Sequence, residues 1–329
     1  METYGITNKP IIDPALSNEN EGNNVTKKID GKIVMRPSSL DIGCWYKYAQ
    51  NAILGKKSKP SGASQLGTSY HYAIELAYSE KLLTHQTPDM SVIKDIAVVN
   101  WDMAVDKLDL SFNSKGDSKE KARDDIANAV NTYAKVIPQV IPIATEQRFT
   151  VGLPKPSSVY SALSGSIDLL ADNRLSTIKV VDHKLTSAKK TSNAYRMQTG
   201  TYELMGKALG YNITATELHN AVRSKELKTK ITPVTQHIIN PTRDKATFNI
   251  IQARMYELIN KAEVYTMLVT EKSIEPNVAV SLLYPTTSHE QHYLCSEDWC
   301  GFYYECPINN PSMFSNFSLL DMVKSDGMS

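Results

Sequence analysis

The sequence lacks the features that mark several specialised classes of protein. Its 329 residues include only four cysteines, too few for the disulfide framework of a small secreted domain. No apolar run approaches the roughly 20 residues of a membrane-spanning helix, and the first residues do not show the charged-then-apolar pattern of a signal peptide. We therefore expect a globular protein of the reducing cytoplasm, without membrane contact, whose cysteines are candidate metal ligands.

An excess of charge of one sign is also missing. The 36 Lys and Arg residues are balanced by 35 Asp and Glu residues, so the formal net charge is +1. Charge alone therefore does not indicate a nucleic acid, a membrane surface or an acidic partner. A G-x-x-x-x-G-K-[ST] phosphate loop is absent as well, which argues against a nucleotide-driven motor.

Hydrophobic periodicity predicts helices first and a mixture of strands and helices later. Residues 1–33 are polar and without periodicity, and we expect a flexible arm there. The predicted helices cover 38–52, a segment opening at Gly67-Thr68, two segments between 90 and 140, 193–209 and 243–270. The predicted strands cover 143–153, 161–172, 177–184, 214–222 and 234–239. The helix after residue 90 is expected to bury the apolar positions Val92, Ile96, Val99 and Met103. This order indicates an α/β core around a mixed sheet rather than a parallel doubly wound sheet.

Two carboxylates and a lysine fall in neighbouring predicted strands. Asp168 lies in one strand, and Asp182 and Lys184 end the next one on the same side, because side chains alternate along a strand. If the strands pair across the turn at 172–174, both carboxylates converge beside the ammonium. Oxygen ligands of this kind suit Mg²⁺ or Mn²⁺. The alternative for an isolated D-x-K triplet is a solvated hairpin end.

Polar and basic side chains follow this pair. Gln198 and Tyr202 lie four residues apart, on one face of the predicted helix. Two basic groups are suited to phosphate: Lys56, Lys57 and Lys59 in one loop, and Lys189, Lys190 and Arg196 after the second strand. The alternative for the second group is a solvated loop.

These residues, taken in order, resemble the RecB-like branch of the PD-(D/E)XK nuclease superfamily. The resemblance is carried by Gly67-Thr68-x-x-His71, Gly165-x-x-Asp168, Asp182-x-Lys184 and Gln198-x-x-x-Tyr202, with Arg36-Pro-Ser-Ser-Leu40 as the opening segment. It implies a restriction-endonuclease-like core, with a central mixed β-sheet flanked by helices. It also implies metal ligation by His71, Asp168, Asp182 and the main-chain carbonyl of His183. Lys184 would be the catalytic lysine, and Gln198 and Tyr202 would hold that lysine or the DNA. An isolated His71 would instead be a helix histidine satisfied within the core. The proline of the family name is absent, since Ile167 precedes Asp168.

The four cysteines form a one-plus-three arrangement. Cys44 lies near the start, and Cys295, Cys300 and Cys306 lie near the end. Four thiolates suit tetrahedral Zn²⁺ or a [4Fe-4S] cluster, and four unrelated buried thiols are the remaining alternative. The arrangement resembles the iron–sulfur staple of RecB-like nucleases of the AddB, exonuclease V and CRISPR-adaptation type, although four residues separate Cys295 from Cys300 where two are more common.

The resemblance implies a domain organisation and an activity. Residues 34–307 would form the nuclease domain, with a helical insertion at about 86–142 and the cysteine staple closing the core, and 308–329 would be a tail. The expected activity is metal-dependent DNA exonuclease cleavage of single strands or duplex ends, in recombination, repair or end processing. A recombination, helicase or adaptation protein is the expected partner, in a virus-encoded or CRISPR-adaptation setting. The alternatives are a non-catalytic DNA-binding iron–sulfur scaffold subunit and an endonuclease of the same superfamily.

Overall fold

The computed structural model describes residues 28–29, 31–40, 43–58, 60–112, 118–173, 177–191, 195–223, 234–241, 245–284, 300–307 and 309. Its strands are β1 (Lys28–Ile29), β2 (Lys32–Met35), β3 (Pro142–Val151), β4 (Tyr160–Asp172), β5 (Ile178–Thr186), β6 (Ile213–Val222) and β7 (Val234–Pro241). Its α-helices are α1 (Trp45–Ala52), α2 (Gly62–Thr84), α3 (Met90–Lys107), α4 (Lys119–Tyr133), α5 (Arg196–Ala208), α6 (Lys245–Thr270) and α7 (Pro276–Leu283), with 3₁₀ turns at Pro37–Leu40 and Ile137–Gln139. None of the described helices is long and apolar enough to cross a bilayer.

One mixed sheet forms the centre of the described part of the chain. Its strand order is β1-β2-β4-β5-β6-β7, and β3 also pairs with β4. The β2–β4 and β5–β6 pairs are parallel and the other pairs are antiparallel. The predicted mixed α/β sheet is therefore confirmed, and it fits a restriction-endonuclease-like core.

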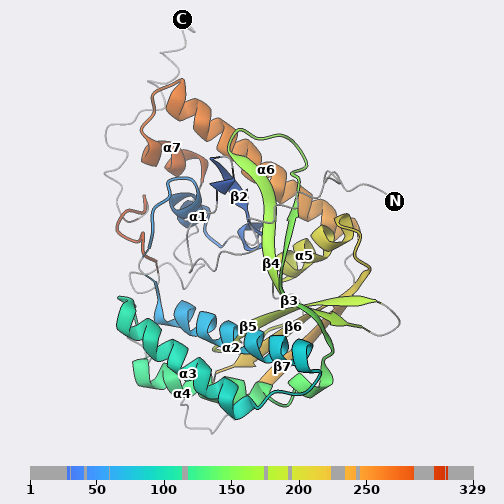
Figure 1. The fold of residues 1–329 in the computed structure, drawn as a ribbon. Helices are drawn as coiled ribbons and strands as arrows, with labels where there is room; N and C mark the ends of the chain where they lie inside the picture. The colour runs from blue at the N-terminus through green and yellow to red at the C-terminus, as the bar shows by residue number, and fades with distance from the viewer. Residues whose placement is uncertain are drawn as a thin grey trace, which may run out of the picture.

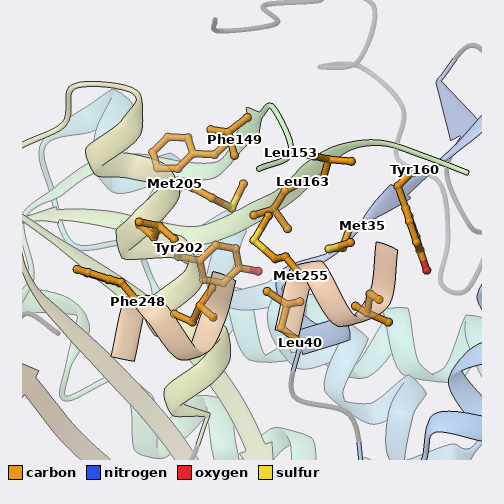
Figure 2. Packing of buried hydrophobic residues seen from close by; sticks show 14 of the residues in the cluster. Met35, Leu40, Phe149, Leu153, Tyr160, Leu163, Tyr202, Met205, Phe248 and Met255 are labelled. Carbon is orange, nitrogen blue, oxygen red and sulfur yellow. The ribbon is translucent and has the colours of Figure 1, made fainter. Parts of the chain in front are cut away.

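Helices cover both faces of this sheet (Figure 1), with α2, α3 and α4 on one face and α5 and α6 on the other. Each face of the sheet therefore packs against its helices in a separate hydrophobic core. Because β5 is buried on both faces, the apolar run at its start is continuous: Val180 packs toward α5 and α6, and Val181 packs toward α2 and α4. Figure 2 shows Tyr202 of α5 and Met255 of α6 in the first of these cores. Each such buried apolar side chain contributes about 1.5–3 kcal/mol.

The N-terminal elements differ from the prediction in three places. Within the predicted arm, β1 and the start of β2 belong to the sheet. The predicted helix at 38–52 is not continuous, because a 3₁₀ turn at Pro37–Leu40 is followed by α1 only from Trp45. Helix α2 begins at Gly62 rather than at Gly67-Thr68, since Ser61 caps it by accepting the Ser64 N–H at 3.1 Å.

Helix α3 buries a different face from the one expected. Ile93, Ala97 and Trp101 are buried, whereas Val92, Val99 and Met103 are each half exposed or more. Trp101 accounts for the difference, because its large ring packs in the core with α2 and α4 while its Nε1 donates to the Lys119 carbonyl at 3.2 Å. Helix α7 is a further difference, since no helix was predicted from the sequence over Pro276–Leu283.

Candidate active site

Two neighbouring strands and one helix on each face of the sheet position the predicted residues. These are Asp168 in β4, Asp182 and Lys184 in β5, His71 in α2, and Gln198 and Tyr202 in α5. The antiparallel ladder of β4 and β5 pairs Leu169 with Val181. One step beyond its end, the same register sets Asp168 across from Asp182. The predicted convergence of the two strands is therefore confirmed.

Asp168 is held from the main chain and from α2. Its Oδ2 accepts the His183 backbone N–H at 2.7 Å, and His71 Nδ1 lies 3.4 Å from the same oxygen. Burial opposes the charged form of Asp168, but His71 and then Lys184 hold the pKa of the carboxyl well below its usual range. Burial alone would lower the pKa of His71, yet Asp168 outweighs it and the pKa is raised. The two side chains thus form a mutually stabilising ion pair.

Asp182 contacts the lysine and the α5 side chains. Its Oδ1 accepts from Lys184 Nζ at 2.9 Å and from Gln198 Nε2 at 3.3 Å, and Gln198 Nε2 also lies 3.5 Å from the Tyr202 hydroxyl. The predicted same-side arrangement of Asp182 with Lys184, and of Gln198 with Tyr202, is confirmed. Burial raises the pKa of Asp182, against the opposing effect of Lys184. Burial would lower the pKa of Lys184, but Asp182 and Asp168 outweigh it and the pKa is raised.

The second carboxylate oxygen of Asp182 is paired with the cation of a neighbouring side chain. The side chain is 2% exposed, and Lys184 Nζ lies 2.7 Å from Oδ2. No hydrogen bond of regular geometry from a described residue reaches this oxygen, so it keeps the capacity to accept from a further cation. Two carboxylates and a main-chain carbonyl are oxygen donors that suit Mg²⁺ or Mn²⁺, and the imidazole of His71 is a softer donor beside them. No three His, Cys, Asp or Glu side chains of the described residues are arranged as ligands around one point, so the ligand roles stay predictions.

Three residues near the site were missed from the sequence. Glu75 follows His71 by one helical turn, a spacing that could have revealed it. Glu146 lies in β3, where the ladder with β4 sets it across from Asp168. Its φ of 45° is left-handed, and burial, followed by the charges of Asp168 and Glu75, raises its pKa to about 7. Tyr195 places its ring 5.3 Å from Lys184 Nζ. No sequence motif marks Glu146 or Tyr195.

The predicted basic groups have varied surroundings. Lys57 and Lys189 are exposed and Lys190 is half-buried. Lys56 Nζ instead lies 2.7 Å from Glu305 Oε2, and Arg196 donates to Thr247 Oγ1 at 2.6 Å. Lys59 lies outside the described residues. Among these side chains, Lys57 and Lys189 are the most open to a ligand.

Three of the four cysteines contact one small apolar cluster. Cys44, Cys300 and Cys306 pack against buried residues that include Tyr46 and Phe302, and none of the three forms a disulfide. Burial and then Cys306 raise the pKa of Tyr46, whose hydroxyl donates to the Glu305 carbonyl at 2.7 Å. Helix α1 therefore contacts segment 300–307 through Tyr46 and this apolar cluster, and the predicted cysteine staple stays a prediction. Cys295 lies outside the described residues.

Of three comparisons with known proteins, one identifies a family. A search of the curated proteins finds no significant match. Among solved structures, the crystal structure of SSO0001 is similar over 62% of this chain and 77% of its own, with 12% identity and a TM-score of 0.26. The family model described as the PD-(D/E)XK nuclease superfamily matches residues 42–294. This match covers most of the chain and includes every residue of the candidate active site, so the chain belongs to the PD-(D/E)XK nuclease superfamily.

Proposed function

We propose that the protein is a Mg²⁺- or Mn²⁺-dependent DNA exonuclease that hydrolyses phosphodiester bonds. The observation that carries the proposal is the convergence of two carboxylates, Asp168 and the buried Asp182, beside the Lys184 ammonium, which lies 2.7 Å from Asp182 Oδ2. The proposed ligands are His71, Asp168, Asp182 and the main-chain carbonyl of His183. When bound, the cation would polarise a phosphate oxygen and lower the pKa of a water molecule.

The protein side chains have separate roles in this proposal. Lys184 keeps its proton, because Asp182 and Asp168 raise its pKa, and its ammonium therefore stabilises negative charge that develops on the phosphate. Gln198 shares Asp182 Oδ1 with Lys184 and so limits the positions that the lysine can take. Asp168 is ionised, because His71 and then Lys184 lower its pKa against the effect of burial, and its carboxylate can therefore accept a cation. His71 would hold that cation as the neutral imidazole, so binding of the cation would release the His71 proton.

The remaining features concern DNA, the cysteines and the setting. Lys57 and Lys189, with Lys56, Lys59, Lys190 and Arg196, are proposed to follow the phosphate backbone of a single strand or a duplex end, and binding should weaken as salt is raised. We further propose that Cys44, Cys295, Cys300 and Cys306 hold a [4Fe-4S] cluster, with Zn²⁺ as the alternative. Recombination, repair or end processing beside a partner protein is the proposed setting.

Cleavage of DNA by matched variants tests the activity. Asp182→Asn and Lys184→Met should abolish metal-dependent digestion of end-labelled linear DNA while the circular dichroism spectrum is kept. Asp95→Asn and Lys135→Met change the same residue types at exposed positions and should cleave like the wild type. Near-wild-type cleavage by Asp182→Asn would refute the assigned site.

The form of the DNA and the metal content separate the finer proposals. An exonuclease degrades linear DNA and leaves closed circles intact, an endonuclease cuts both, and a DNA-binding scaffold cuts neither. Iron and sulfide in the purified protein that disappear in Cys300→Ser would support the cluster. Zinc at one equivalent would support the alternative, and absence of both metals from the protein purified without oxygen would refute a metal staple.

A further inference from the structure

A continuous line of buried polar side chains runs behind the candidate active site, on the α4 side of the sheet. At one end, Lys179 Nζ donates to Glu217 Oε1 at 2.9 Å, and His219 Nε2 lies 2.8 Å from Glu217 Oε2. At the other end, the Tyr133 hydroxyl lies 2.6 Å from His219 Nδ1 and 2.9 Å from His183 Nε2. Tyr133 and His219 are 0% exposed and His183 is 2% exposed. The catalytic proposal uses none of these side chains.

The Tyr133 hydroxyl joins the two histidines whichever way its proton points. An ionised Glu217 only accepts, so His219 donates to it from Nε2. The single Tyr133 proton can be donated to His219 Nδ1 or to His183 Nε2, and the Tyr133 oxygen accepts from a protonated neighbour, such as the other ring nitrogen or the Tyr78 hydroxyl at 3.0 Å. In either order the hydroxyl is the hydrogen-bond partner of His183 Nε2.

The line ends on a main-chain segment of the candidate metal site. The His183 backbone N–H donates to Asp168 Oδ2 at 2.7 Å, and its carbonyl is a proposed metal ligand. Its ring is fixed by stacking on Tyr78, with centroids 5.8 Å apart and planes at 12°, and by the Tyr133 hydroxyl. A shift of this ring would therefore move the backbone groups that face Asp168 and the cation.

We propose that Tyr133 is a positioning residue for the metal centre, holding His183 through its hydroxyl from helix α4. The inference rests on the proposed function, because it concerns the cation that Asp168 and Asp182 would hold. A role limited to packing would need only the ring of Tyr133. Removing the hydroxyl takes away the hydrogen bond at His183 Nε2 in a buried site, and the His183 side chain is then expected to move toward another partner. Loss of such outer-shell partners weakens metal binding by about 10- to 100-fold.

The test compares Tyr133→Phe with Tyr70→Phe in the full-length protein. Both changes remove one buried tyrosine hydroxyl, but the Tyr70 hydroxyl has no hydrogen-bond partner among the described residues. Mn²⁺ affinity is measured by calorimetric titration and by the electron paramagnetic resonance signal of free Mn²⁺. Tyr133→Phe should bind Mn²⁺ at least about tenfold more weakly, with cleavage recovered at higher Mn²⁺ and the KM for DNA unchanged. Tyr70→Phe should match the wild type.

The outcomes separate this inference from the proposed function. If Asp182→Asn does not reduce Mn²⁺ binding by the folded protein, both are overturned. If Asp182→Asn abolishes binding but Tyr133→Phe keeps wild-type affinity, only the positioning role is overturned, even where the melting temperature falls. If Tyr133→Phe does not fold, nitrogen-15 resonances of the wild-type histidines decide. A hydrogen bond at His183 Nε2, as donor or as acceptor, supports the role, and an Nε2 resonance without any hydrogen bond refutes it.

Discussion

Replacing Glu217 by Gln should make the protein less stable at neutral pH and remove part of its sensitivity to acid. The carboxylate is 6% exposed and receives hydrogen bonds from Lys179 and His219. Burial raises its pKa, but the two donors outweigh burial and bring it from 4.5 to about 2. The glutamine keeps the shape of the side chain and removes its charge.

The expected magnitude follows from this change in pKa. A folded-state pKa of about 2 against an ordinary value of 4.5 corresponds to about 3 kcal/mol of stability at most. Solvent reaches the Lys179 partner, whose side chain is 15% exposed, and screening reduces the expected loss in Glu217→Gln to about 2 kcal/mol at pH 7. Because the folded pKa is depressed, this contribution is complete above pH 4.5 and disappears as the pH falls toward 2.

Urea unfolding of the wild type and the variant at several pH values from 7 to 3 measures the effect. The difference in the free energy of unfolding between the two proteins should be about 2 kcal/mol at pH 7 and should narrow steadily below pH 4.5. Glu257→Gln is the matched control, since that side chain is 41% exposed in its ion pair with Arg254 and should cost less than about 0.5 kcal/mol. A difference for Glu217→Gln that stays constant across this pH range would refute the assigned charge interaction.

Three further substitutions test local packing. Ser61→Ala removes the cap of α2 and should lower the free energy of unfolding by about 1 kcal/mol in a urea titration. A Cβ at Gly165 would lie 2.8 Å from Pro37 Cδ and 3.0 Å from Tyr202 Cε1, so Gly165→Ala should cost about 1–3 kcal/mol and slow cleavage by displacing Tyr202. An unchanged melting temperature and rate would contradict that close approach. Met255 is 0% exposed, so Met255→Ala should lower the free energy of unfolding by about 2–5 kcal/mol in the same titration. A decrease of less than about 1 kcal/mol would contradict this and would mean that neighbouring side chains fill the cavity.

The parts of the site that follow strand periodicity could be predicted. Alternation along β5 correctly set Asp182 and Lys184 on one side, and helical spacing correctly set Gln198 near Tyr202. The approach of Asp168 to Asp182 depends on the pairing of β4 with β5, and the turn after Asp172 was the sequence signal for that pairing. The mixed sheet followed from the order of the elements, because a hairpin and a crossover helix require different strand directions.

The parts that depend on tertiary packing could not be predicted. Both faces of α3 are apolar, and periodicity alone cannot show which face is buried. The buried face is decided by the tertiary packing of Trp101, which the sequence does not reveal. Glu217 and His219 alternate as any strand residues do, so nothing local indicates that Tyr133, more than 80 residues earlier, supplies their partner. Glu146 meets Asp168 only through the register of two strands.

Strand β5 connects Asp182 of the candidate active site, on one face of the sheet, with helix α4 on the other face. It is buried on both faces, and a polar side chain on either face therefore needs a partner. Asp182 meets Lys184 and Gln198 on the α5 side, whereas His183, one residue along, meets Tyr133 on the α4 side. The same backbone therefore holds a candidate ligand on one face and its support on the other. A change in α4 that leaves the side chains proposed to contact DNA intact should accordingly weaken metal binding before it weakens DNA binding.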